Sequence, residues 1–374
     1  MAGIYIHIPF CRKACHYCDF HFSTSLTYKN ELILNLLKEI DLRSDYLAGE
    51  SVDTIYIGGG TPSLLSETEL SSLLERIHQR FTVHPLAECT LEANPDDLDK
   101  KKISEIKRSG VNRLSIGIQS FFDKDLLYMN RSHNGQEAAN CIANIQEGGI
   151  DNFSIDLIFG YPLLTNEKWE QNIQKALSFN VPHLSCYAMT VEPKTALASF
   201  IANHKALPMN QEQSAFQFEY LMKILEGNGY EHYEISNYAK PGKRAIHNSN
   251  YWKGVSYLGL GPSAHSFNGE SRQWNVANNA QYIKALSENR IPFEQEILTT
   301  NQKLNERIMT TLRTSEGLNY TYVVNQLLKD ELEEWTHHIS NFEHEGMIVK
   351  LDDQIILTKK GKLFADHIAG ELFV

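Results

Sequence analysis

The chain has 374 residues, of which 42% are hydrophobic and 22% are charged, so it can form one large domain and a smaller one and is neither disordered nor fibrous. Its 46 acidic side chains outnumber its 35 basic ones, and the formal net charge of −11 excludes a broadly basic, nucleic-acid-binding surface. The apolar runs are too short for a membrane-spanning helix, and the first residues lack the features of a signal peptide. We therefore expect a cytoplasmic protein without stable membrane insertion.

Short apolar runs alternate with helical patterns along the first half of the chain. Ile4, Ile6 and Ile8 recur at every second position and predict a first strand that ends at Pro9. A helix follows around residues 28–47, and further helical patterns separate the later strands, which we predict over residues 54–57, 89–92, 114–119, 153–159 and 183–188. This alternation predicts an α/β fold whose parallel sheet curls into a partial (β/α)6 TIM-like barrel. Polar and glycine residues follow several strands, where such folds place their active sites.

A different pattern begins near Asn301. Two helices, around residues 303–313 and 331–345, precede a hairpin over residues 347–358 and a last helix through Ile368. This order resembles a small winged-helix-like α+β domain. Its 8 basic and 12 acidic side chains favour a structural or protein-docking role over DNA binding. The predicted division is a barrel domain over residues 1–235, a connecting region over 236–300 and a C-terminal domain over 301–374.

Three of the six cysteines stand together directly after the first strand. Cys11, Cys15 and Cys18 have the spacing C-x3-C-x2-C, which suits an iron–sulfur cluster. Three thiolates leave one iron of a [4Fe–4S] cluster without a protein ligand, and that open iron can bind a substrate or cofactor. The alternative is a structural zinc site with His16 or His21 as the fourth ligand. We interpret the other cysteines as small core residues: Cys89, Cys141 and Cys186.

The cysteine spacing, with Tyr17 before the last cysteine, resembles the signature of the radical S-adenosylmethionine (radical SAM) superfamily. Two further segments, Tyr5–Cys11 and Gly58–Pro62, resemble the branch that contains oxygen-independent coproporphyrinogen III oxidase and the HemW heme chaperones. The resemblance covers nearly the whole chain. It implies that the three clustered cysteines ligate three irons of a [4Fe–4S] cluster. The amino and carboxylate groups of S-adenosylmethionine (SAM) would chelate the fourth iron.

The resemblance also implies which residues surround SAM. Tyr5 and Tyr17 match positions that flank SAM and the cluster, and the glycine loop after the second strand matches the loop that receives the methionine end. Arg131 suits the SAM carboxylate through its planar guanidinium group, and Asp156 suits the ribose hydroxyls as an acceptor. Ala188 matches an adenine contact. The full implied set is Tyr5, Tyr17, Gly59, Gly60, Thr61, Glu92, Gln119, Arg131, Asp156 and Ala188.

Three features distinguish the members of this branch. Phe20 stands where the oxidases carry a fourth cysteine, and the oxidases have an N-terminal extension, whereas the first strand here begins at Ile4. The segment His247-Asn248-Ser249-Asn250-Tyr251-Trp252 fits the H-N-x-x-Y-W motif associated with HemW. Imidazole is a good axial ligand for heme iron, and aromatic rings can pack on a porphyrin face. His247 is therefore the candidate heme ligand, with His265, His7 and any cysteine that does not hold the cluster as rivals.

These features together predict a heme chaperone in place of a coproporphyrinogen oxidase. It would bind heme, pass it to a heme-requiring acceptor protein, and hold a [4Fe–4S] cluster and exchangeable SAM. The enzymatic alternative is an oxygen-independent coproporphyrinogen III oxidase, in which a SAM-derived 5′-deoxyadenosyl radical takes hydrogen from the propionate side chains. A third possibility, from another class, is a zinc-stabilised interaction protein with a decayed cofactor site.

Overall fold

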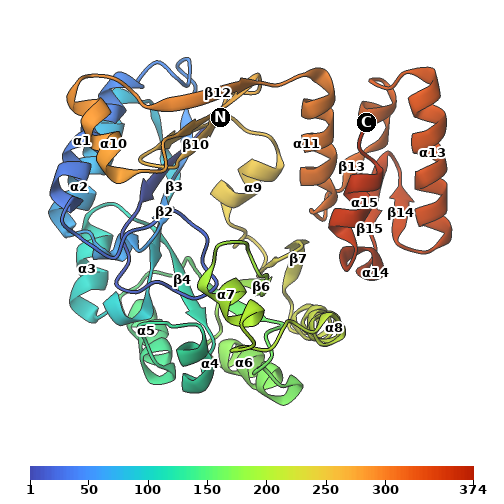
Figure 1. Cartoon of the computed structure of the whole chain (residues 1–374), viewed down its shortest axis with the longest axis horizontal. Helices are drawn as coiled ribbons and strands as arrows, with labels where there is room; N and C mark the ends of the chain where they lie inside the picture. The colour runs from blue at the N-terminus through green and yellow to red at the C-terminus, as the bar shows by residue number, and fades with distance from the viewer.

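The computed structural model describes residues 1–374 and is dominated by an open arc of twelve strands (Figure 1). Helices cover the outer, convex side of the arc. Strands β1 to β6 are neighbours in chain order and run parallel, which confirms the predicted α/β fold class with its alternation of strands and helices. Their bounds are β1 Ala2–Ile8, β2 Val52–Gly59, β3 Val83–Ala93, β4 Arg113–Gln119, β5 Phe153–Phe159 and β6 His183–Ala188.

The crossover helices bury one apolar face each against the sheet. In α2 (Glu67–Arg80) this face consists of Leu70, Leu73, Leu74 and Ile77. The helix begins with a capping box, because Ser66 Oγ accepts a hydrogen bond from the Glu69 backbone N–H while the Glu69 carboxylate accepts one from the Ser66 N–H. The other helices of this layer are α1 Lys29–Leu42, α3 Lys100–Arg108, α4 Asp123–Tyr128, α5 Gly135–Glu147, α6 Asn166–Ser178 and α8 Gln211–Gly227.

Further strands extend the sheet at both edges. β9 (Tyr257–Leu260) runs parallel to β1, and an antiparallel ribbon continues from it. The predicted connecting region 236–300 thus supplies five strands to the main sheet, and its helix α9 (Ile246–Trp252) lies on the concave side of the arc (Figure 1). The remaining elements of these edges are β7 Glu231–Glu234, β8 Asn237–Ala239, β10 His265–Phe267, β11 Ser271–Asn275, β12 Phe293–Ile297 and α10 Asn279–Ser287.

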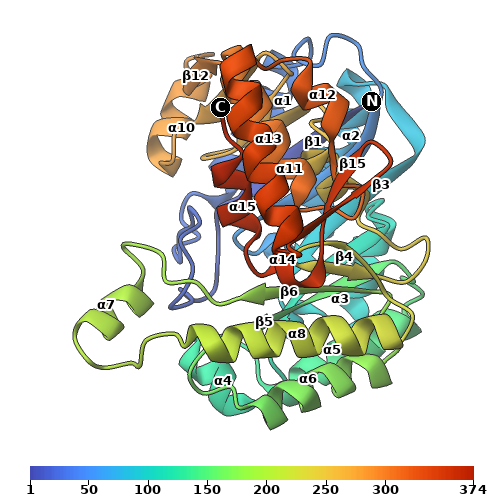
Figure 2. The ribbon, with the colours of Figure 1, turned by 90° about the vertical axis from the view of Figure 1, so that its right-hand side faces the viewer.

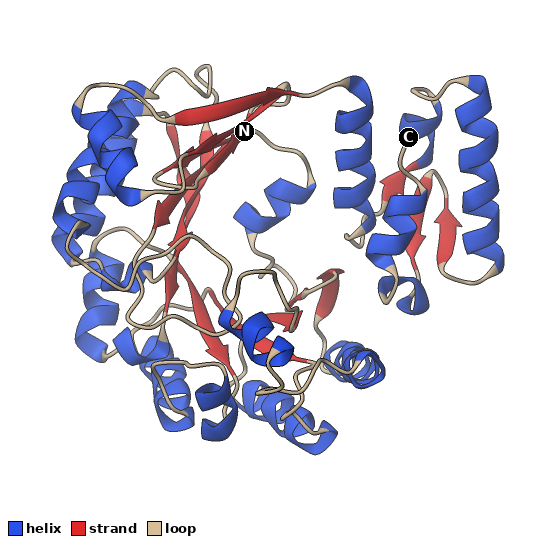
Figure 3. Ribbon diagram, viewed as in Figure 1, coloured by secondary structure: helices blue, strands red, loops and turns tan.

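The C-terminal elements form a second body with its own three-stranded sheet and its own 15-residue apolar core (Figures 2 and 3). The predicted hairpin is present, whereas the predicted last helix is divided in two. The domain boundaries at residues 235 and 300 stay a prediction. None of the helices combines the length and apolar character that a bilayer crossing requires. The bounds are α11 Thr300–Leu312, β13 Leu318–Asn319, α12 Tyr320–Val324, α13 Lys329–His344, β14 Ile348–Leu351, β15 Gln354–Leu357, α14 Lys359–Lys362 and α15 Ala365–Glu371.

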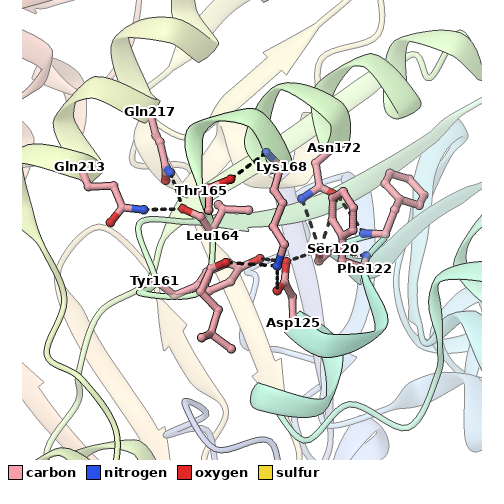
Figure 4. Close-up of polar contacts among 12 residues, drawn as sticks. Ser120, Phe122, Asp125, Tyr161, Leu164, Thr165, Lys168, Asn172, Gln213 and Gln217 are labelled. Carbon is pink, nitrogen blue, oxygen red and sulfur yellow. Dashed lines mark hydrogen bonds and ion pairs between the residues drawn. The ribbon is translucent and has the colours of Figure 1, made fainter.

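A buried polar network fixes the chain directly after β4 (Figure 4). The Asp125 carboxylate accepts hydrogen bonds from Lys168 Nζ at 2.7 Å and from the Tyr161 hydroxyl at 2.9 Å. Ser120 Oγ lies 3.3 Å from the same carboxylate. Because Ser120 follows Gln119, this network holds the end of β4 in place while Gln119 adopts a left-handed φ of 63°.

Candidate functional site

A cavity of about 470 Å³ opens at the C-terminal ends of the parallel strands. The three clustered cysteines line it together with residues from the ends of β2 to β6. This is where an α/β sheet of this kind presents side chains from several strands to one ligand. Nine of the ten residues that the resemblance implies for SAM line the cavity: Tyr17, Gly59, Gly60, Thr61, Glu92, Gln119, Arg131, Asp156 and Ala188.

Main-chain hydrogen bonds order the loop that carries the cysteines. The Cys11 N–H donates to the Ser23 carbonyl at 3.0 Å, and the Cys18 N–H donates to the Cys15 carbonyl at 3.3 Å. Burial and the neighbouring thiols raise the pKa of Cys18 to about 12, and burial also raises the pKa of Cys11. Raised pKa values favour the protonated form of these two thiols until a cation replaces their protons, as cluster irons would.

The alternative of a single zinc ion does not fit these residues. His16 Nδ1 is hydrogen-bonded to the Tyr128 carbonyl at 2.8 Å, and His21 Nε2 to Asn279 Oδ1 at 2.8 Å. Neither histidine lines the cysteine cavity. Moreover, no three His, Cys, Asp or Glu side chains lie close enough together to hold one metal ion. Three separated thiolates fit a cluster, in which each thiolate binds its own iron.

Three buried polar atoms in the cavity wall have no hydrogen-bond partner. They are Gln119 Oε1, Arg131 Nε and Asp156 Oδ1. A buried polar group without a partner costs about 1–3 kcal/mol, so such groups are rare in native structures unless a ligand satisfies them. Two acceptors and one donor around one cavity fit a zwitterionic, hydroxyl-bearing ligand, and SAM has this chemistry. The residues present therefore fit the cofactor that the resemblance implies.

Two carboxyl groups give the cavity an acidic wall. Glu92 accepts hydrogen bonds from the Tyr56 hydroxyl at 2.7 Å and from the Gly59 N–H at 3.0 Å. Burial raises the pKa of Glu92 to about 7 and that of Asp156 to about 6, and the charge of Asp156 adds to the shift of Glu92. A cationic ligand such as a sulfonium would favour the ionised form of both groups.

Because the pKa of Asp156 is raised, the unfolding free energy of the ligand-free protein should depend on pH. Asp156 is protonated in both states below its unfolded pKa of 3.8, and above about pH 6 the folded state must bury its charge. The Asp156→Asn variant should therefore gain about 1–3 kcal/mol in unfolding free energy near pH 8, with the gain developing between about pH 4 and 6. Urea denaturation of the cluster-free protein at acidic and alkaline pH would measure this change. A gain of equal size at both pH values would contradict the prediction.

The glycine loop after β2 packs main chain to main chain against the segment before the cysteines. The Gly60 N–H donates to the Ile8 carbonyl at 2.9 Å, and the Thr61 N–H donates to the Phe10 carbonyl at 2.7 Å. A Cβ atom on Gly60 would lie 2.6 Å from the Phe10 carbonyl oxygen and 2.8 Å from that of Ile8. Only glycine lets the loop after β2 and the cysteine loop come this close together.

The Gly60→Ala variant should therefore move the loop, weaken SAM binding and lower the unfolding free energy by about 1–3 kcal/mol, as overpacking does. Calorimetric titration of SAM into the cluster-reconstituted protein would measure the binding change. Gly227→Ala is the matched control, because a Cβ at that position meets no atom within 4 Å. Equal SAM affinity in the two variants would show that the close approach does not shape the site.

Comparison with known proteins agrees with this geometry. The family model described as the radical SAM superfamily matches residues 5–176. Heme chaperone HemW of Bacillus subtilis is 34% identical over 373 residues, covering 99% of this chain and 98% of the relative. Heme chaperone HemW of Escherichia coli is 32% identical and covers 100% of this chain and 98% of the relative. The chain belongs to the HemW family.

The fold of this HemW-family chain has a solved counterpart. The structure of coproporphyrinogen III oxidase (HemN) from Escherichia coli, a radical SAM enzyme, superposes with a TM-score of 0.86 at 23% sequence identity. The alignment covers 100% of this chain and 90% of that chain. This likeness confirms the radical SAM fold.

The HemW motif lies on α9, and its histidine is enclosed. His247 is 2% exposed. Its Nδ1 is hydrogen-bonded to Thr54 Oγ1 at 2.8 Å and its Nε2 to the Tyr251 hydroxyl at 3.0 Å. The imidazole also stacks on Tyr56, with ring centroids 5.0 Å apart. Both ring nitrogens are thus engaged, and in this conformation His247 presents no lone pair to an iron. Its assignment as heme ligand stays a prediction that requires the imidazole to give up one of these hydrogen bonds.

Other motif residues face three different cavities. Asn248 lines the cysteine cavity, and Trp252 lines a cavity of about 760 Å³ between α9 and the C-terminal elements. Tyr251 lines a third cavity, of about 340 Å³, beside β1. Tyr5 lines this third cavity, outside the predicted SAM site, and its hydroxyl is hydrogen-bonded to His7 Nδ1 at 3.0 Å. The helix therefore stands at the junction of the three spaces.

Asn94 is one of the cavity residues that the sequence analysis did not name, and it contacts a predicted site residue. Asn94 lines the cysteine cavity directly after β3, and its Oδ1 accepts a hydrogen bond from Arg131 Nη2 at 2.8 Å. This bond orients the guanidinium group, whose Nη1 lies 3.4 Å from Cys15 Sγ. A polar residue directly after a predicted strand was the signal that could have identified Asn94.

Proposed function

We propose that this chain is a heme carrier that binds heme and passes it to an acceptor protein that requires it. The observation that carries this proposal is similarity over nearly the full length to relatives named heme chaperone HemW. Phe20 supports it, because an aromatic ring that is 67% exposed stands at the cavity wall where the oxidases have a fourth cysteine. Heme is the cargo in this proposal.

The cavity at the strand ends would hold the resident cofactors. Cys11, Cys15 and Cys18 would ligate a [4Fe–4S] cluster, which when bound supplies an electron for reductive cleavage of SAM. The unpartnered atoms of Gln119 and Asp156 would take up hydrogen bonds from the polar groups of SAM. SAM would be exchangeable, because the cavity opens to solvent at the strand ends, where exposed residues such as Ala188 line it. In this proposal the cluster and SAM organise the protein or gate its heme binding.

Anaerobic titration of hemin into the cluster-reconstituted protein tests the proposal. We expect the Soret absorbance to saturate near one heme per chain. The loaded protein is then mixed with a heme-free b-type cytochrome. The cytochrome should take up heme from the loaded protein faster than it takes up free hemin at the same concentration. Uptake of hemin that never saturates would overturn the proposal.

A second assay addresses the oxidase alternative. Reduced protein incubated anaerobically with SAM and coproporphyrinogen III should yield no protoporphyrinogen, because Phe20 removes the thiol present in the oxidases. Turnover to protoporphyrinogen would favour the oxidase over the carrier.

A further inference from the structure

The cavity beside β1 brings imidazoles and aromatic rings together. It has a volume of about 340 Å³, and its wall includes His7, His21, His265, Tyr5, Tyr251 and Tyr257. Phe20 and Asp19 line both this cavity and the cysteine cavity, so the two spaces adjoin. A flat, apolar ring system that carries a metal ion would find ring faces and nitrogen ligands here.

The three histidines of this cavity differ in how free their nitrogens are. His7 is 5% exposed, and its Nδ1 and Nε2 are hydrogen-bonded to the Tyr5 hydroxyl and the His21 carbonyl. His21 uses Nε2 to bind Asn279. The His265 side chain is exposed, and neither of its ring nitrogens has a hydrogen-bond partner. His265 is therefore the imidazole of this cavity that can bind a metal ion without first losing a hydrogen bond.

The backbone beneath His265 is rigidly held. A Cβ atom on Gly259 would lie 1.9 Å from the His265 carbonyl oxygen, so β9 and β10 touch directly here. The preceding turn is fixed because the Gly261 N–H donates to the buried Glu39 carboxylate at 2.8 Å, and Asn275 Nδ2 donates to the Gly261 carbonyl at 2.9 Å. A ligand side chain on such a support is positioned before its metal arrives.

One aromatic ring lies beside this imidazole, and others line the same cavity. Trp274, which faces His265 across the β10–β11 pair, has its ring 6.2 Å away and tilted by 30°. Tyr251 and Tyr257 pack edge to face, with centroids 4.7 Å apart. Phe20 stands exposed at the edge shared with the cysteine cavity. A porphyrin would have apolar neighbours on one side and solvent on the other, which suits a site that must release its ligand.

On these contacts we propose that His265 is the axial ligand of the heme iron and that His247 is a positioning residue. His247 holds α9 against β2 through Thr54 and fixes the Tyr251 hydroxyl, which places the Tyr251 ring in the wall of the heme cavity. This inference rests on the proposed function, in which heme is the cargo. It assigns the iron to a histidine outside the H-N-x-x-Y-W motif.

Chemical rescue separates a ligand from a positioning residue. We would titrate hemin anaerobically into the reconstituted wild-type protein and the variants His265→Gly and His247→Gly, following the Soret band and the electron paramagnetic resonance of the ferric heme. His265→Gly should weaken binding by at least about tenfold, since loss of even an outer partner of a metal ligand costs about 10–100-fold. Added imidazole should restore the wild-type spectrum in this variant, because it can occupy the vacated position. Binding in His247→Gly should also weaken, without rescue.

His344→Ala is the control, because His344 is an exposed histidine at the end of α13 and lines none of the three cavities. Far-ultraviolet circular dichroism would verify that each variant is folded. If the wild-type protein saturates but His265→Gly has the same affinity and spectrum, the inference is overturned while the proposed function stands. Rescue of His247→Gly by imidazole would also overturn it, in favour of the motif histidine. Non-saturating uptake by the wild-type protein would overturn both.

Discussion

Replacing Cys15 with alanine is expected to abolish the iron–sulfur cluster. Iron and acid-labile sulfide in the anaerobically reconstituted protein should fall from about four of each per chain to near background. The reason is that only three thiols line the cavity, so no spare ligand is available when one is lost. Neither His16 nor His21 lines this cavity, so neither is placed to substitute for the lost thiolate.

Cys89→Ala provides the matched control for this experiment. Cys89 is a buried cysteine in β3 and is absent from the wall of the cofactor cavity. This variant should keep the absorbance near 400 nm and the full iron content. A Cys15→Ala protein that retains all its iron and sulfide would contradict the cluster assignment. Zinc without sulfide in the wild-type protein would revive the zinc alternative.

The parallel strands could be predicted because each is a local, strongly apolar pattern. Ile4, Ile6 and Ile8 are fully buried, and residues 153–159 are apolar almost throughout because both faces of that strand are covered. The edge strands could not be predicted. Every residue of β12 is exposed, and β11 contains Arg272 and Gln273. Neither strand therefore has the alternation of apolar and polar residues that marks one buried and one solvent-exposed face. Their structure depends on pairing with each other.

The site was predictable to the extent that its residues follow strands in sequence. Glu92, Gln119 and Asp156 belong to three different strands, and the parallel sheet brings them to one cavity, as expected. The enclosure of His247 could not be predicted, since its partners Thr54 and Tyr56 lie on β2, far away in the sequence. A motif names residue types, whereas the direction in which an imidazole points depends on tertiary contacts.

Contacts between residues far apart in the sequence also hold α9, the helix that carries the HemW motif. Among them, the loss of Glu88 should destabilise this helix most. Its carboxylate accepts hydrogen bonds from the backbone N–H groups of Ile246 and His247, both at 2.9 Å. Arg113 Nε lies 3.9 Å from the same carboxylate, and the two side chains are only 1% and 3% exposed. Removing Glu88 leaves a buried cation and two backbone donors without their partner. We expect Glu88→Ala to lower the unfolding free energy by about 3–5 kcal/mol, which is the usual cost of removing one partner of a buried ion pair.

Urea denaturation at neutral pH would measure this loss. The control is Glu67→Ala, which removes the partly exposed partner of Arg108 at 2.7 Å and should change stability little. Heme affinity gives a second measurement, because Glu88 holds α9 while touching none of the three cavities. Under conditions where the variant stays folded, its hemin binding should weaken without rescue by imidazole, as for a positioning residue. Loss of stability with unchanged heme affinity would mean that the orientation of α9 does not control the heme cavity, and His247 would then have only a structural role.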